Sequence, residues 1–361
     1  MRAALDAILA VVRGSTLARR RECGYSGLSA EDCLARGCLW QPPQPDESDL
    51  GPRPWCLRPA PSRKVVAVTF VWGEDWAPLV PRFAAWAVKL GLGTVVVAMG
   101  AACRRACEAA VDALEGRSSG VACWDPLQFA GEAEAGQGGE RGSILQRHVM
   151  VHLLLHLGID ALAFDFDTFF FSDPRPRLEA VANEEGADIL MARHLDADCL
   201  NMGLLYARAS ARTAEWYSRY LEWLHQHPYE REQRGANALL GFTGQAVSFP
   251  PRGLPKVRAA ALDDANEFAS SRGGWLGDWS QLRFFHWVNP EETTQGWRDV
   301  KIADLRSLYE VALHHSVDVH AAGGSLATIL GAVEAGSSLR YVRDALESMR
   351  VWRPPRRRVC W

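Results

Sequence analysis

The chain has 361 residues, of which 48% are hydrophobic and 23% charged, a balance that is ordinary for a globular protein and excludes a largely disordered one. Its length exceeds that of one compact domain and suits a domain of ~250 residues with a small added module. The formal net charge of −3 gives no basis for nucleic acid as a partner.

The N-terminal segment, residues 1–21, is expected to be a linker or a weak secretory signal. Residues 3–12 are mostly apolar, but Asp6 interrupts the run and no clear cleavage site follows it. No stretch of the sequence approaches the ~20 consecutive apolar residues that a membrane-spanning helix needs. A membrane anchor, if the protein has one, is not visible in this chain.

Cysteines are concentrated near the N-terminus, at Cys23, Cys33, Cys38 and Cys56. This clustering predicts a disulfide-rich module over residues 22–58, because a core this small depends on crosslinks. A four-cysteine zinc site is the competing interpretation, but Cys23 and Cys56 supply no second close pair. The sequence leaves five further cysteines unassigned: Cys103, Cys107, Cys123, Cys199 and Cys360.

The segments Cys23-Gly, Gly-Cys38-Leu39-Trp and Pro-Trp-Cys56-Leu together resemble the trefoil (P-type) domain. That family has six cysteines, whereas this chain lacks the first and has Leu39 in place of the fifth, and those two are partners in the family. The resemblance therefore implies two remaining bridges, Cys23–Cys38 and Cys33–Cys56. It also implies an oxidising compartment, so we expect the secretory pathway, either the Golgi lumen or secretion.

A second domain is expected over residues 64–320, after a proline-containing linker. Its first half alternates between apolar runs and segments with helical spacing, which predicts strands at 64–71 and 94–99 and helices at 81–90 and 101–115. Gly91 is expected to end the first of these helices. The alternation predicts an α/β fold, a mostly parallel sheet flanked by helices.

The next elements lead into and out of a phenylalanine-rich run. Residues 130–142 are rich in glycine and are expected to form a loop, and Ser143 then starts a helix that ends at Gly158. Strands are predicted at 187–192 and 201–207, and a helix is predicted to begin at Ser210 or Thr213. That helix places one set of side chains on a face expected to pack in the core: Trp216, Tyr220, Trp223 and Leu224. Residues 321–361 suggest one more helix and a tail.

Two aspartates, Asp165 and Asp167, lie in the apolar run 161–174. In an extended strand alternate side chains share a face, so these carboxylates are expected to point together and to repel each other unless a cation lies between them. Mn²⁺ or Mg²⁺ prefers oxygen ligands and leaves positions open for phosphate oxygens. A second Asp-x-Asp, at Asp196 and Asp198, lies in a polar stretch and is expected to be a solvated loop.

The order of motifs along residues 64–305 resembles the nucleotide-diphospho-sugar transferase family, which has a GT-A (Rossmann-like) fold and includes plant and algal xylosyl-, galactosyl- and arabinosyltransferases. The motifs that carry the resemblance are a strand near 64–70, Asp165-Phe-Asp167 with Asp-Pro174, Asn201-Met-Gly203, Glu232-Gln233 with Asn237, and Phe-His286-Trp.

The resemblance implies a metal and phosphate site. Asp165 and Asp167 would hold Mn²⁺, or Mg²⁺, as the cofactor, and His286 would complete the metal's ligands or contact the diphosphate; a structural histidine is the alternative. Lys301 and Arg283 are candidate phosphate contacts, with exposure to solvent as the alternative for both.

The resemblance also implies a binding site for the donor. Asn201 would bind sugar hydroxyls while Gly203 lets the substrate approach the backbone. Gln233 matches an Asp-Gln pair of the family, in which this chain has Glu232 instead of aspartate. Thr69 and Val71 would lie beside the nucleotide base and ribose, although packing within the strand explains them equally well.

The expected function is transfer of a sugar from a nucleotide-diphosphate donor to a hydroxyl of a glycan or glycoprotein, with retention of configuration implied by the resemblance only. No residue stands out as a catalytic nucleophile. A catalytically inactive carbohydrate-binding protein is the main alternative. A phosphohydrolase is a weaker one, because the sequence has no dense His/Asp cluster for a two-metal site.

Overall fold

The computed structural model describes residues 11, 39–41, 55–57, 64–114, 120–126, 132–194, 196–228, 230–242, 253–263, 266–270, 282–287 and 295–314. For a few of these, chiefly 132–143 and 194–199, the backbone alone is described. None of the helices in these ranges combines the length and apolar composition needed to cross a bilayer.

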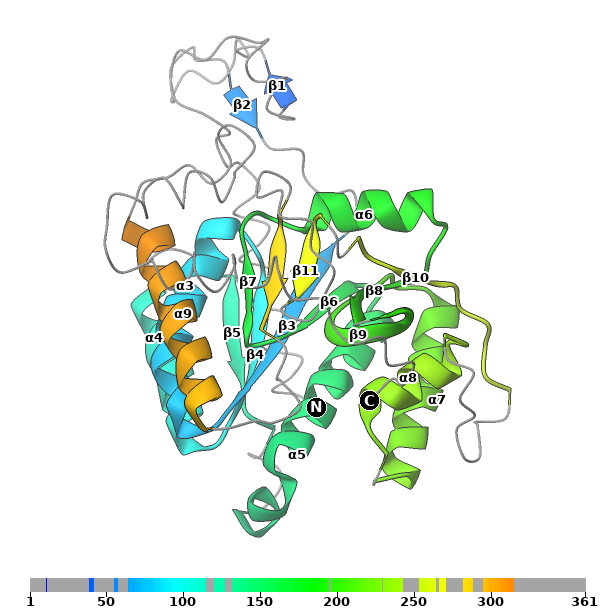
Figure 1. The fold of residues 1–361 in the computed structure, drawn as a ribbon, viewed down its shortest axis with the longest axis horizontal. Coiled ribbons are helices and arrows are strands. Elements are labelled where there is room, and N and C mark those ends of the chain that lie inside the picture. The colour runs from blue at the N-terminus through cyan, green and yellow to red at the C-terminus, as the bar shows by residue number, and fades with distance from the viewer. Residues whose placement is uncertain are drawn as a thin grey trace.

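A seven-stranded, mostly parallel sheet forms the centre of the fold (Figure 1). Only β9 runs against its neighbours among the described strands of this sheet. The strand order across the sheet is β10 (Ala259–Ala261), β8 (Ile189–His194), β9 (Asp196–Ala207), β6 (Asp160–Asp165), β3 (Val65–Trp72), β4 (Thr94–Met99) and β5 (Val121–Trp124). The predicted α/β class with a mostly parallel sheet is confirmed.

Helices cover both faces of this sheet and enclose two apolar cores (Figure 1). One face carries η1 (Glu74–Leu79), α3 (Val80–Leu90), α4 (Ala101–Leu114), α6 (Arg175–Glu184) and α9 (Gln295–His314). The other carries α5 (Glu132–His156), α7 (Ala211–Gln226) and α8 (Glu232–Leu239). The central strands are valine-rich runs buried between the two layers, as expected of parallel strands that are covered on both sides.

Glycine and serine residues in the sequence correctly predicted where several helices begin or end. Gly91 ends α3 with a φ of 71°, and Gly158 follows α5 with a φ of 72°, a left-handed conformation that suits glycine. Ser210 caps α7, its hydroxyl accepting a hydrogen bond from the backbone N–H of Thr213 at 3.0 Å. The aromatic face of α7 is buried, as predicted.

Three predictions about local structure are wrong. The glycine-rich segment is not a loop, because α5 begins at Glu132, where good helix formers such as Glu132, Ala133 and Ala135 offset glycines that cost about 1 kcal/mol each. The backbone of residues 196–200 is part of β9 and not a loop. The run 161–174 is not one strand, since β6 ends at Asp165 and β7 (Thr168–Phe170) belongs to another sheet.

That second sheet has three strands, β11 (Phe268–Ser270), β12 (Phe284–His286) and β7. β12 pairs antiparallel with β7, so that His286 lies opposite Thr168. Residues more than a hundred positions apart are thereby joined at the carboxyl end of β6, where ligands collect in open α/β sheets.

The N-terminal module is described only at β1 (Leu39–Gln41) and β2 (Trp55–Leu57), which pair antiparallel with Trp40 opposite Cys56. The predicted bridges Cys23–Cys38 and Cys33–Cys56 lie outside the described residues, as do the segment 321–361 and nearly all of residues 1–21.

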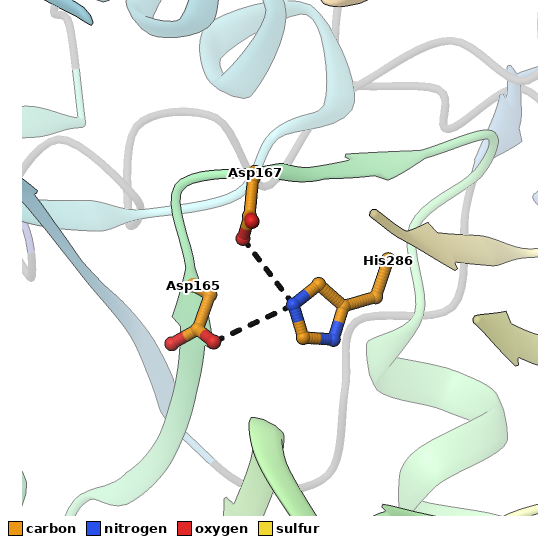
Figure 2. Close-up of side chains that lie close together, drawn as sticks. All are labelled: Asp165, Asp167 and His286. Atoms are coloured by element: carbon orange, nitrogen blue, oxygen red, sulfur yellow. Dashed lines mark ion pairs between the residues drawn. The ribbon is translucent and has the colours of Figure 1, made fainter. Parts of the chain in front are cut away.

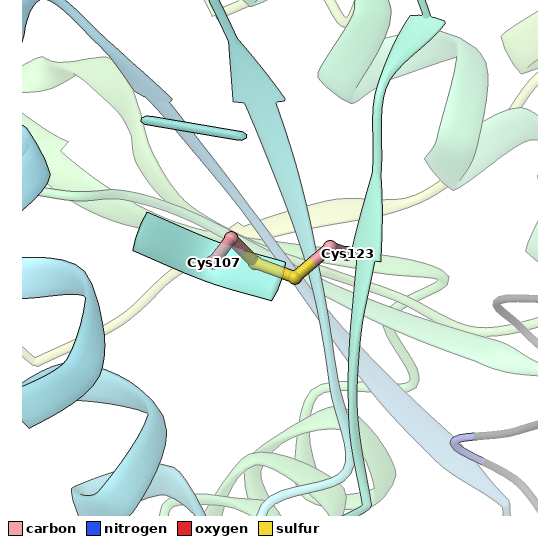
Figure 3. Close-up of a disulfide and its surroundings, with 2 residues drawn as sticks. All are labelled: Cys107 and Cys123. Carbon is pink, nitrogen blue, oxygen red and sulfur yellow. A yellow bond between two sulfur atoms is a disulfide. The ribbon is translucent and has the colours of Figure 1, made fainter. Parts of the chain in front are cut away.

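One disulfide that the sequence left unassigned joins Cys107 on α4 to Cys123 on β5 (Figure 3). It fixes a helix to the edge strand of the large sheet, and closing a loop of this length is worth about 3 kcal/mol in the chain-entropy estimate. Cys103, one turn before Cys107, is a buried free thiol.

Candidate active site

Asp165 and Asp167 flank the bend between β6 and β7. Asp165 is the last residue of β6, and the hydroxyl of Thr168 donates to its carbonyl oxygen at 2.8 Å. The backbone N–H of Trp287 donates to the carbonyl oxygen of Asp167 at 3.0 Å. Between the aspartates Phe166 is buried. The bend, rather than strand alternation, therefore brings the two carboxylates together.

His286 completes this group from β12 (Figure 2). Its Nε2 atom lies 3.2 Å from Oδ1 of Asp167 and 3.5 Å from Oδ2 of Asp165. One ligand atom from each of the three residues lies within 4.8 Å of the others. The structure thus brings together all three residues that the sequence predicted as metal ligands.

Two buried cations hold the other carboxylate oxygens. Lys301, on α9, donates from Nζ to Oδ2 of Asp167 at 2.5 Å. Arg147, on α5, donates to Oδ1 of Asp165, and its guanidinium lies over the ring of Phe70. Burial raises the pKa of Asp167, but the ammonium of Lys301 and the imidazole of His286 more than offset this and hold the pKa below its ordinary value.

The donor set fits Mn²⁺ or Mg²⁺. Each aspartate has one oxygen bound to a cation and one facing His286, so two carboxylate oxygens and one imidazole nitrogen remain as ligands. Hard divalent ions accept such ligands and retain open positions for other oxygens. Asp165 and Asp167 keep side-chain exposures of 28% and 18%, so neither carboxylate is fully closed off from solvent.

The structure gives a reason for glycine at position 203 that the sequence did not predict. A Cβ atom at this position would lie 2.1 Å from Cε1 and 2.4 Å from Nδ1 of His286. The imidazole therefore makes a close approach to this backbone. Asn201 is buried, and its Oδ1 accepts a hydrogen bond from the N–H of Gly203 at 2.6 Å. This contact holds the strand next to the histidine.

Glu232 and Gln233 are the first two residues of α8, which lies next to β9. Oε1 of Gln233 accepts from the N–H of Met202 at 3.2 Å, and the carbonyl oxygen of Glu232 accepts from the hydroxyl of Tyr220 at 2.9 Å. Asn237, one turn later, bonds both the N–H and the carbonyl of Leu200. The pair and Asn237 thus support the strand that carries Asn201 and Gly203.

Three predicted donor contacts have other neighbours in the structure. Thr69 is fully buried in β3 between β4 and β6, with its hydroxyl unpartnered among the described residues, so packing within the strand accounts for it. Val71 is also buried. Arg283 lies beside Glu267, with Nε 3.7 Å from Oε1.

Replacing Thr69 by valine tests whether packing within the strand accounts for this residue. Because the buried hydroxyl has no hydrogen-bond partner in the described part of the chain, we expect Thr69→Val to leave the free energy of unfolding unchanged or to raise it by about 1 kcal/mol. Urea denaturation measures this. Binding of a nucleotide-sugar, measured on the same preparation, should stay within twofold, and a loss of tenfold or more would restore Thr69 to the donor site.

Arg147 is the site residue that the sequence analysis missed. It lies on the buried face of α5, in register with Met150, Val151 and Leu154, all of them buried. A cation within an otherwise apolar helical stripe needs a buried partner. An arginine on the apolar face of the helix that leads to the two aspartates could therefore have been recognised from the sequence as a site residue.

Asp304 lies one turn after Lys301 on α9 and is almost fully buried. Its Oδ2 atom has no hydrogen-bond partner in the described part of the chain. Burial raises the pKa of this carboxyl to about 6, and the nearby indole of Trp287 opposes the rise only in part. At neutral pH the folded protein therefore carries an unfavourable buried charge.

Asp304→Asn should stabilise the protein at pH 7 by roughly 1–3 kcal/mol, since a pKa difference of one unit corresponds to about 1.4 kcal/mol. The folded carboxyl takes up its proton near pH 6 and the unfolded one near 3.9, so this penalty in the wild type disappears as the pH falls from 7 to about 4. Urea denaturation of both proteins at pH 7 and pH 4.5 measures the difference. An equal difference at both values would contradict the assignment.

Comparison with known proteins accounts for this combination of fold and site. Residues 94–281 match the nucleotide-diphospho-sugar transferase family, and residues 16–59 match the trefoil (P-type) domain. The chain belongs to the nucleotide-diphospho-sugar transferase family. It is a glycosyltransferase of the nucleotide-sugar type, with the GT-A fold of that family and an added trefoil domain.

Solved structures similar to this transferase are remote from it. The galactosyltransferase LgtC, in complex with donor and acceptor sugar analogues, is 14% identical with a TM-score of 0.39, covering 66% of this chain and 95% of its own. Mouse xyloside xylosyltransferase 1 is 15% identical with a TM-score of 0.37, and the match covers 64% of this chain and 99% of the mouse protein. A Pyrobaculum calidifontis mannosyltransferase, in complex with GDP-Man and Mn²⁺, is 13% identical with a TM-score of 0.35, and the match covers 98% of this chain and 94% of the mannosyltransferase. No curated protein matches the chain significantly.

Proposed function

We propose that this transferase moves a sugar from a nucleoside-diphosphate donor to a hydroxyl of a glycan or glycoprotein, with Mn²⁺ or Mg²⁺ held by Asp165, Asp167 and His286. The observation that carries the proposal is the convergence of Oδ2 of Asp165, Oδ1 of Asp167 and Nε2 of His286 at the carboxyl end of β6. A divalent ion at this point supplies Lewis-acid stabilisation to the diphosphate as it leaves.

The protein's own residues would position the donor. Lys301 and Arg147 fix the orientation of the two carboxylates through their ion pairs and place positive charge beside the diphosphate. Asn201 holds the backbone of Gly203 against His286, which keeps the imidazole directed at both aspartates. Gln233 and Glu232, at the start of α8, support this strand, and the family resemblance suggests them as contacts of the donor sugar.

The stereochemical course of transfer is proposed to be retention, from the family resemblance alone. No residue is assigned as a nucleophile. We propose that the trefoil domain binds glycan or positions the acceptor. The Cys107–Cys123 disulfide and the match to a cysteine-rich domain support a place in the secretory pathway, in the Golgi lumen or outside the cell, because disulfides persist in oxidising compartments.

An assay of donor cleavage tests the proposed reaction. Purified protein is incubated with UDP-, GDP- and CMP-sugars, with Mn²⁺, Mg²⁺ or EDTA, and release of the nucleotide is measured with and without simple sugar acceptors. We expect one donor class to be consumed only when a divalent ion is present. If glycans bind but no donor is bound or cleaved under any condition, the protein is a carbohydrate-binding relative without transferase activity.

A further inference from the structure

A second group of potential metal ligands lies between α5 and α7, apart from the candidate active site. His152 and His156 are one turn apart on α5, and Ser218 lies on α7 opposite them. Nε2 of His152 is 2.7 Å from Oγ of Ser218, and Nε2 of His156 is 3.2 Å from the same oxygen. Two imidazole nitrogens from one helix thus converge on a single point.

The geometry of this group suits chelation. Residues four apart share one face of a helix, and the two ring centroids are 4.4 Å apart. Zinc binds imidazole nitrogen at about 2.0–2.1 Å, so an ion next to the serine oxygen comes within reach of both nitrogens after small rotations of the rings. The hydroxyl marks the place that the ion or its bound water would take.

The surroundings of the group also suit a cation. The hydroxyl of Ser218 faces both Nε2 atoms and donates to the carbonyl oxygen of Ala214 at 3.0 Å. His156 is exposed, so an ion carrying water molecules can reach the site.

We propose that His152 and His156 chelate a Zn²⁺ ion, with the hydroxyl of Ser218 and water completing a tetrahedral set of ligands. The ion joins the end of α5 to α7. α5 also carries Arg147, and through Gly158 it leads into β6, which ends at Asp165. Zn²⁺ at this site therefore stabilises the helix that supports one of the two aspartates, independently of the transferase reaction.

Calorimetric titration of full-length protein with ZnCl₂ tests the proposal, in a buffer containing saturating Mn²⁺ to occupy the other site. His156→Gln should weaken Zn²⁺ binding at least about tenfold, and because His156 is exposed the variant should fold. His225→Gln is the matched control, an exposed histidine on α7 seven residues beyond Ser218, about 10 Å along the helix. It should bind Zn²⁺ as the wild type does.

A second comparison separates this site from the candidate active site. Asp167→Asn should retain the Zn²⁺ binding that His156→Gln loses. A rise in melting temperature with Zn²⁺ should follow the same pattern, since an ion that binds only the folded state stabilises it. If His156→Gln binds Zn²⁺ as tightly as the wild type, or if Asp167→Asn abolishes binding, there is no zinc site at His152 and His156.

Discussion

Asp167→Asn is expected to lower kcat/KM for the donor at least about 100-fold, because the substitution removes a metal ligand without changing the size of the side chain. It also removes the negative charge that Lys301 contacts at this position, so the buried ammonium would repel a divalent ion more strongly. The assay is nucleotide release under Mn²⁺, expressed per folded molecule as judged by near-ultraviolet circular dichroism.

The second Asp-x-Asp of the chain supplies the matched control for this prediction. Asp198→Asn makes the same chemical change in the same motif, at a residue to which no role in metal binding is assigned, and it should retain wild-type activity within about twofold. Equal activity of Asp167→Asn and wild type would refute the role assigned to this carboxylate. If both variants lose activity equally, the loss would come from a general effect on folding and not from removal of a metal ligand.

Gly203→Ala is expected to have the second large effect. The added methyl group would overlap the ring of His286, with Cβ 2.1 Å from Cε1, so the imidazole must turn away from Asp165 and Asp167. We expect affinity for Mn²⁺ to fall at least about tenfold and the free energy of unfolding to fall by roughly 1–3 kcal/mol, as for overpacked sites elsewhere. Calorimetric titration with Mn²⁺ and urea denaturation measure the two effects.

Gly235→Ala separates steric damage from damage to the site. A Cβ atom there would lie 2.3 Å from the ring of Trp223, on α7 rather than beside the metal ligands. This variant should lose stability to a similar degree but retain Mn²⁺ affinity per folded molecule. If Gly203→Ala retains that affinity too, the close packing of His286 on β9 has no bearing on metal binding.

Features set by neighbouring residues were predictable from the sequence. The strands at β3 and β4, the helices α3 and α4 and the turns at Gly91 and Gly158 follow from hydrophobic spacing and from the left-handed backbone that glycine tolerates. The two aspartates were found in the same way, since they follow an apolar strand at the edge of the sheet where ligands bind.

Features that depend on contacts between distant segments were not predictable in the same way. His286 reaches the aspartates because β12 pairs with β7, and the use of Gly203 becomes visible only once that ring lies against it. The Cys107–Cys123 bridge could not be chosen among five unassigned cysteines from spacing alone. The early start of α5 shows that good helix formers can outweigh several glycines.

Calorimetric titration of the wild-type protein with UDP and GDP, each in Mn²⁺ and in EDTA, tests the central claim most directly. If the carboxylates and His286 share a divalent ion with the diphosphate, one nucleotide should bind at least about tenfold more tightly in Mn²⁺ than in EDTA. Equal affinity for that nucleotide in Mn²⁺ and in EDTA would contradict it.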